Sequence, residues 1–254
     1  MFFEAQNLTK RFGGITAVSD LSFSIEREEI VAIFGPNGSG KTTLLSLIAG
    51  VVRPTAGILI WKSRRLEGRP PHEIAAAGIV KTFQNPQLFA ELSVTQHVMI
   101  AAHLRLQRQL GVRRIKTLFR ADGGSAELAD RVDHVLRLCR LTELRDEPAV
   151  SLSYGAEKML GVAMALMCEP ELLLLDEPAT GLGQEEIRNL DGVLRDLRDH
   201  GTTLCVIDHR VGFLGRLADR AIAMHHGSKL AEGAPGDVLR DAGVVEAYLG
   251  RPHA

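Results

Sequence analysis

One stretch of the chain has the glycine, lysine and hydroxyl spacing of a phosphate-binding loop, Gly35-Pro36-Asn37-Gly38-Ser39-Gly40-Lys41-Thr42. Its glycines let successive backbone N–H groups converge on phosphate oxygens. Lys41 is suited to neutralise the β and γ phosphates, and the Thr42 hydroxyl is suited to bind Mg²⁺. The stretch predicts a nucleotide site contacted by Gly35, Asn37, Gly38, Ser39, Gly40, Lys41, Thr42 and Thr43.

The flanking sequence favours this nucleotide site over a glycine-rich turn that matches the pattern by chance. Ile30 to Phe34 is wholly apolar, as in a strand buried on both faces of a parallel sheet. A helix is predicted from Lys41 to about Ala49, and its N-terminal dipole favours an anion. A strand, a glycine-rich loop and a helix in this order are the context that the motif requires.

A pair of carboxylates follows a second apolar strand, Leu172 to Leu175. Ligands of open α/β sheets lie at the carboxyl ends of the strands, where Asp176 and Glu177 are placed. We expect Asp176 to hold Mg²⁺ and Glu177 to orient or deprotonate the water that attacks the γ phosphate. The alternative is an acidic start to a polar turn, and the phosphate loop earlier in the chain favours the catalytic interpretation.

The elements that must position these residues predict an α/β fold. Short strands are expected near Phe3 to Leu8 and Val18 to Ile25, with a turn at Gly13-Gly14. Helical periodicity prevails between about residues 85 and 164, as in the apolar face made by Leu128, Val132, Val135, Leu136 and Cys139. Strand character returns at Leu172 to Leu175 and Thr203 to Ile207, with a helix from about Gln184 to His200 between them. This alternation predicts a mostly parallel sheet core with an antiparallel β part and a helical insertion.

Length and composition limit the possible functions. The 254 residues suit one large α/β domain, and a formal net charge of -1 gives no general attraction to nucleic acid or anionic membrane. No apolar run approaches the roughly eighteen residues needed to span a bilayer, and the first residues lack the regions of a signal peptide. Three widely separated cysteines, Cys139, Cys168 and Cys205, fit a reducing cytoplasm.

Leu152-Ser153-Tyr154-Gly155 resembles the signature motif of ABC transporter ATPases. Gln84 resembles the glutamine loop of that family, Ala179 to Leu182 the start of its D-loop, and His209 its switch histidine. Taken alone, each has an ordinary alternative: Gln84 as a surface residue, Ser153 as a helix cap and His209 as a helix-start histidine. Their order around the two stronger motifs favours the family.

The resemblance implies a P-loop NTPase (RecA-like) fold in a single ABC ATPase domain, with a nucleotide-binding core at about 1–84 and 165–254 and a helical subdomain at about 85–164. It implies that Glu177, His209 and Gln84 are catalytic and that Thr42, Gln84 and Asp176 surround Mg²⁺. Phe12 resembles the aromatic residue that stacks on adenine, with a core phenylalanine as the alternative. Ser153 and Gly155 are expected to contact ATP bound to a second subunit.

The resemblance is nearest to the longer type of branched-chain amino acid importer ATPase. Four stretches carry it: Gly13 to Val18, Thr82 to Phe89, Leu152 to Gly155 and Val244 to Gly250. ATPases of urea importers and lipopolysaccharide exporters look similar and stay open as alternatives, as does, less favoured, a soluble non-transport ABC ATPase. A small-molecule kinase gives no reason for the signature.

This resemblance also implies partners. Two ATPase subunits, identical or different, would pair head to tail on transmembrane permease subunits at the cytoplasmic face of the inner membrane. A solute-binding protein is expected in the system, and nucleic acid is not. The bound cofactors are expected to be ATP and Mg²⁺.

The chain departs from the importer pattern at Ala156-Glu157-Lys158-Met159, where glutamines followed by arginines are usual, and at Gly183 and Arg210, where acidic or amide residues are common. We expect weaker pairing of subunits from the first departure. A basic stretch between His103 and Asp122 is interpreted as a solvated face, with a membrane-proximal or permease-contacting segment as the alternative: Arg105, Arg108, Arg113, Arg114, Lys116 and Arg120.

Overall fold

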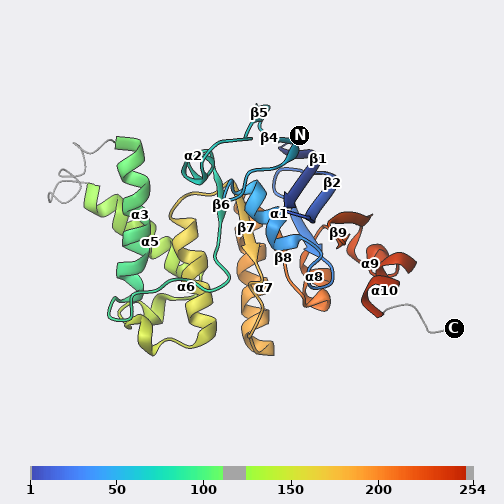
Figure 1. The fold of residues 1–254 in the computed structure, drawn as a ribbon. Helices are drawn as coiled ribbons and strands as arrows, with labels where there is room; N and C mark the ends of the chain where they lie inside the picture. Colours follow the sequence, from blue (N-terminus) through green and yellow to red (C-terminus); the bar gives the residue numbers. More distant parts are fainter. Residues whose placement is uncertain (1, 111–123, 250–254) are drawn as a thin grey trace.

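The computed structural model describes residues 2–110 and 124–249. They form two β-sheets and a set of helices, with helix α1 (Lys41–Ile48) between the sheets and the longer helices on the opposite side of the larger sheet (Figure 1). The α/β class predicted from the sequence is therefore confirmed.

The larger sheet has the strand order β10-β9-β3-β8-β7-β6. The β9–β10 pair is antiparallel, and the remaining neighbours are parallel. The strands are β3 (Ile30–Phe34), β6 (Ile79–Lys81), β7 (Leu172–Asp176), β8 (Thr203–Ile207), β9 (Arg220–His225) and β10 (Ser228–Gly233). Because parallel strands end at the same edge, the loops after β3, β6, β7 and β8 meet along one side of the sheet.

The smaller sheet is antiparallel, in the order β2-β1-β4-β5. Its strands are β1 (Phe3–Phe12), β2 (Ile15–Ile25), β4 (Ala56–Trp61) and β5 (Arg64–Arg65). The predicted turn at Gly13-Gly14 joins β1 to β2, but both strands are longer than predicted. Lys10 pairs with Val18 and Arg11 with Thr16, so a backbone ladder extends the hairpin where no apolar alternation signals a strand.

The helical region contains the three long helices that precede β7, namely α3 (Val94–Leu110), α5 (Gly124–Leu138) and α6 (Tyr154–Leu166). The predicted apolar face of α5 is confirmed: Val132, Val135, Leu136 and the following Cys139 are buried, and Leu128 packs against them. The other helices of the described residues are α2 (Pro71–Ala76), α7 (Gln184–Asp199), α8 (Val211–Leu217), α9 (Pro235–Val238) and α10 (Ala242–Leu249), with short 3₁₀ turns at Thr142–Leu144 (η1) and Ala149–Ser151 (η2).

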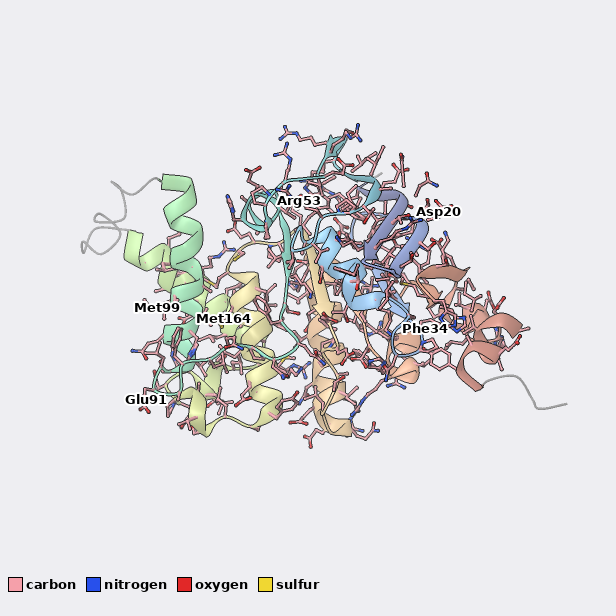
Figure 2. The ribbon with its side chains drawn as sticks, in the orientation of Figure 1. Asp20, Phe34, Arg53, Glu91, Met99 and Met164 are labelled. Carbon is pink, nitrogen blue, oxygen red and sulfur yellow. The ribbon has the colours of Figure 1, made fainter. Side chains whose placement is uncertain are left out.

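The larger sheet buries both faces, as its apolar strands predict. Along β3, Ile30, Ala32 and Phe34 face the core shared with the long helices, and Val31 and Ile33 face the core shared with α1 and the smaller sheet. Side chains fill the interior around the larger sheet, with Met164 on α6 on the side of the long helices and Phe34, at the end of β3, toward α10 (Figure 2). This double burial holds the strand ends, and so the loops after them, in place.

In the described part of the chain, no helix combines the length and the apolar character that a bilayer crossing needs.

The thiols test this packing. Cys139 and Cys205 are fully buried, and burial raises the pKa of each to about 12, whereas Cys168 is half-buried. Since the thiolate is the reactive form, neither buried cysteine should react with a disulfide reagent at pH 8. We expect at most one rapidly reacting thiol in the native protein and all three in denaturant. Rapid reaction of two or three native thiols would contradict the packing.

Candidate active site

The phosphate loop connects the end of β3 to the start of α1. Gly38 and Gly40 have φ values of 78° and 99°, which favour glycine, and Gly40 caps α1. A Cβ on Gly40 would lie 2.1 Å from the carbonyl oxygen of Ala17 on β2, so the backbone passes too close for any side chain. The sequence of glycines therefore fixes the loop's path against the smaller sheet.

The opposite side of the loop rests on the turn between β9 and β10. A Cβ on Gly35 would lie 2.1 Å from the carbonyl oxygen of Met224, and the amide of Gly227 donates to the carbonyl of Ser39 at 3.1 Å. Ser39 itself is 2% exposed. The loop is thus held from two sides before any ligand binds.

Lys41 lies inside the loop that it serves. Its ammonium donates to the carbonyl oxygens of Gly35 at 2.8 Å and Pro36 at 3.0 Å. Burial lowers the pKa of Lys41, while the nearby carboxylates of Glu177 and Asp176 act in the opposite direction. A buried cation enclosed by a loop of backbone groups is suited to an anionic ligand with several negative oxygens.

The remaining loop residues line the solvent side of this cradle. Asn37 and Thr42 are exposed, and Thr43 is half-buried in the first turn of α1. No Cβ clash arises at Gly38, so space remains above the loop at that point. The residues present therefore fit bound phosphate groups.

Asp176 is the last residue of β7 and is 5% exposed. Its carboxylate forms an ion pair of 3.0 Å with Lys81, the last residue of β6. Since β7 lies two strands from β3, this carboxylate faces the same sheet edge as the phosphate loop. A buried carboxylate at this edge is suited to hold a cation beside phosphate.

Glu177 follows directly in a left-handed backbone conformation, with a φ of 51°. This conformation is uncommon for a residue with a side chain, and the amide of Glu177 is held by the carbonyl of Ile207 on β8 at 2.8 Å. Strain of this kind clusters at functional sites because neighbouring structure must hold it. Here it turns the carboxylate out of the strand.

The carboxylate of Glu177 is held by side chains from two neighbouring loops. Gln84 Nε2 donates to Glu177 Oε2 at 2.7 Å, and His209 Nε2 lies 2.5 Å from Glu177 Oε1. Thr180 also donates to Oε2 at 3.3 Å. The structure therefore brings together the three residues predicted to be catalytic, Glu177, Gln84 and His209.

Phe12 ends β1 and is 48% exposed, so the alternative of a core phenylalanine is wrong. The ammonium of Lys10 lies 4.8 Å from the centre of its ring. An exposed ring beside the hairpin turn is available to stack on a planar ligand.

The signature segment begins α6. The hydroxyl of Ser153 accepts a hydrogen bond from the amide of Ala156 at 3.3 Å, so Ser153 does serve as the helix cap that was given as its alternative role. Gly155 is buried beneath Glu186 of α7, where a Cβ would lie 2.3 Å from Glu186 Oε1. A side chain at this position would therefore displace the Glu186 carboxylate.

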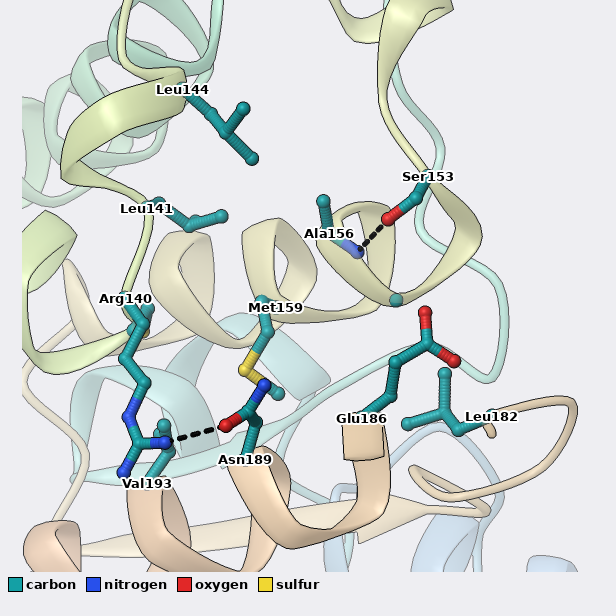
Figure 3. Close-up of a pocket in the computed structure, with 12 residues that line it drawn as sticks. Arg140, Leu141, Leu144, Ser153, Ala156, Met159, Leu182, Glu186, Asn189 and Val193 are labelled. Atoms are coloured by element: carbon teal, nitrogen blue, oxygen red, sulfur yellow. Dashed lines mark hydrogen bonds between the residues drawn. The ribbon is translucent and has the colours of Figure 1, made fainter. Parts of the chain in front are cut away.

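A cavity of about 180 Å³ adjoins the signature segment between α6, α7 and η1 (Figure 3). Ser153, Ala156 and Glu186 lie at one end, and Arg140 with Asn189 at the other, joined by a hydrogen bond of 2.7 Å. Different elements surround the phosphate loop, so Ser153 and Gly155 belong to a separate region of the molecule.

At Gly183 and Arg210, where the sequence departs from the importer pattern, the backbone amides still form hydrogen bonds to nearby carboxylates. Gly183 caps α7 without a side chain, and its amide instead donates to Glu186 Oε2 at 2.7 Å. The amide of Arg210 donates to Asp208 at 2.9 Å. The predicted basic stretch from Arg105 to Arg120 lies outside the residues whose side chains are described.

Asp208, a fully buried acid after β8, was not predicted from the sequence. Asp208 Oδ2 accepts a hydrogen bond from the amide of Ala179 at 2.8 Å. Asp208 therefore joins the loop after β7 to the loop after β8. The signal was available, because Asp208 follows an apolar strand just as Asp176 does. Lys81, the ion-pair partner of Asp176, and Lys158, described below, gave no such signal.

A phosphate loop after β3, with paired carboxylates at the end of β7, defines a P-loop NTPase. The ABC transporter family matches residues 18–180, and the branched-chain amino acid ATP-binding cassette transporter family matches residues 228–254. The chain therefore belongs to the ABC transporter ATPases and, within them, to the LivG and BraF group.

The relatives match over nearly their whole length. The high-affinity branched-chain amino acid transport ATP-binding protein LivG of Salmonella typhimurium is 37% identical over 245 residues, covering 96% of this chain and 95% of that protein. BraF of Pseudomonas aeruginosa, with the same description, is 34% identical over 249 residues, covering 97% of each. A crystal structure of a nucleotide-free ATP-binding cassette from an ABC transporter has a TM-score of 0.84 at 28% identity, covering 98% of this chain and 99% of that chain.

Lys41→Ala tests the cradle. Loss of a buried ammonium that contacts phosphate should weaken ATP binding about tenfold to hundredfold, the range for hydrogen bonds to charged groups. Fluorescent-nucleotide titration would measure this, with Lys62→Ala as a surface control that should bind normally. Unchanged affinity in Lys41→Ala would contradict the cradle.

Proposed function

We propose that the chain powers the uptake of branched-chain amino acids, as a peripheral subunit on the cytoplasmic face of the inner membrane. ATP hydrolysis is supported by the position of Glu177 between Gln84 and His209, at the sheet edge that also holds the phosphate loop. The solute class rests on the printed descriptions of LivG and BraF.

In the proposed reaction, the loop from Gly35 to Thr43 binds the phosphates of ATP and Lys41 neutralises their charge. Glu177 orients the attacking water and accepts its proton. His209 steadies that carboxylate through the contact of its Nε2 with Glu177 Oε1. Phe12 stacks on the adenine.

Mg²⁺ supplies charge neutralisation at the β and γ phosphates when bound. Thr42 and Asp176 would hold it with phosphate oxygens and water, a set that suits its preference for few protein ligands. Gln84 is also suited to this position. Its amide nitrogen contacts Glu177, which leaves Oε1 as the ligand atom.

The separation of the signature segment from the phosphate loop supports a paired arrangement. Ser153 and Gly155 border α7 and η1, whereas the phosphate loop borders β2, β9 and the turn between β9 and β10. One chain therefore supplies the phosphate loop of one nucleotide site and the signature segment of another. A second ATPase subunit placed head to tail would complete each one, with the N-terminus of α6 facing the γ phosphate.

Apolar side chains beside the glutamine loop support docking on permease subunits. Phe83 is 74% exposed and Phe89 is 61% exposed, on either side of Gln84 along the chain. Exposed aromatic residues gathered in one segment mark an interaction surface. A permease seated there would sense movements of Gln84, and a solute-binding protein would deliver the solute from the other side of the membrane.

Glu177→Gln should separate binding from hydrolysis. Removing a general base costs about a hundredfold or more in rate, whereas the phosphate loop is untouched. We expect normal ATP affinity, slow phosphate release and an ATP-bound dimer in size-exclusion chromatography. Glu185→Gln, an exposed neighbour on α7, is the matched control. Hydrolysis at the parent rate in Glu177→Gln would remove Glu177 from the proposed role.

Reconstitution with the permease subunits of the proposed importer tests the solute. In vesicles, ATP hydrolysis should rise when leucine, isoleucine or valine is supplied with the solute-binding protein. Urea and lipopolysaccharide are the comparison substrates, because ATPases of those systems resemble this chain. Stimulation by either one, without a response to branched-chain amino acids, would overturn the proposed solute.

A further inference from the structure

Lys158 is a buried cation that the proposed reaction does not use. It lies on the second turn of α6 and is 6% exposed. Its ammonium donates to the main-chain carbonyl of Gln84 and lies 5.3 Å from the centre of the Tyr154 ring. Among the described residues, no carboxylate forms an ion pair with it.

An ammonium in this position is costly to bury. Lys158 lines a groove whose other walls are largely apolar side chains, including Phe83, Met159 and Val162. The carboxylate of Asp176 also lines this groove, but its ion pair is with Lys81. The direct partners of the Lys158 ammonium are one carbonyl and one aromatic face. An apolar side chain of similar length would pack there at lower cost, so stability alone does not explain a lysine.

The contact acts on the segment that carries Gln84. β6 ends at Lys81, and the amide of Thr82 is still held by the carbonyl of Leu174 on β7 at 2.9 Å. Beyond Thr82 the chain leaves the sheet. The bond from Lys158 to the carbonyl of Gln84 is therefore what fixes the main chain at the residue whose amide reaches Glu177.

Tyr154 adds a second connection from the same helix. Its hydroxyl lies 3.3 Å from Asn85 Oδ1, next to Gln84. Its ring also covers Gly181, where a Cβ would lie 2.5 Å from Tyr154 Cε1. The start of α6 thus contacts both the glutamine loop and the turn that follows Glu177.

We propose that Lys158 is a positioning residue for ATP hydrolysis: it fixes the main chain at Gln84 so that the Gln84 amide holds the Glu177 carboxylate. This inference rests on the proposed role of Glu177. In the proposed dimer, the N-terminus of α6 faces ATP bound to the other subunit. Lys158 then links the nucleotide of one subunit to the catalytic carboxylate of its partner.

Lys158→Met tests this role, because methionine keeps the length and removes the charge. We expect kcat to fall about tenfold or more, since small misplacements of catalytic groups have effects of this size. ATP affinity should stay within about twofold of the parent, and the thermal midpoint should stay equal or rise. Lys158→Arg should restore kcat, because its guanidinium can donate to the same carbonyl. Lys62→Met, on the surface, is the matched control.

Three results would overturn the proposal. One is a kcat of Lys158→Met equal to that of the parent chain. Another is a fall in kcat matched by a fall in thermal midpoint or ATP affinity, which would indicate a structural role. The third is a further tenfold loss when Lys158→Met is added to Gln84→Ala, because the two should act through one contact. A parent chain that fails to hydrolyse ATP would instead count against the proposed function.

Discussion

The hydrogen bonds around the Glu177 carboxylate depend on the parallel order of the central sheet. Gln84 follows β6, Glu177 follows β7 and His209 follows β8, and these strands are neighbours. Residues far apart in sequence meet because parallel strands end at one edge. β3 is the next strand, so the phosphate loop joins the same edge. The left-handed backbone of Glu177 persists because β8 and both flanking loops hold it.

The sequence was sufficient for the buried strands and insufficient for the contacts between loops. Thr203–Ile207 was predicted to the residue because a short, wholly apolar run has few alternatives, whereas the three-residue β6 has no pattern of its own and forms by pairing with β7. Gln84 and Glu177 followed from motif order. The roles of Lys158 and Asp208 did not, because each is defined by partners that are distant in sequence and close in the fold.

Two departures from the importer pattern, Gly183 and Ala156, are explained by contacts near them in the structure. Gly183 removes a capping side chain, but Glu186 accepts from its amide and also covers Gly155. One carboxylate thereby joins the first turns of α6 and α7, where helix dipoles favour negative charge. Ala156 lies at the rim of the cavity beside Ser153 and adds no polar group to that surface. We expect its effect on subunit pairing, because the phosphate loop lies on other elements.

The central claim is that Glu177 and His209 act as one unit, and a double-mutant cycle measures this most directly. Single-turnover hydrolysis would be compared in the parent, Glu177→Gln, His209→Ala and the double variant. If the histidine acts through the carboxylate that it contacts, adding His209→Ala to Glu177→Gln should slow hydrolysis by less than about twofold, although His209→Ala alone slows it strongly. Rate losses that multiply in the double variant would show independent action and contradict the account.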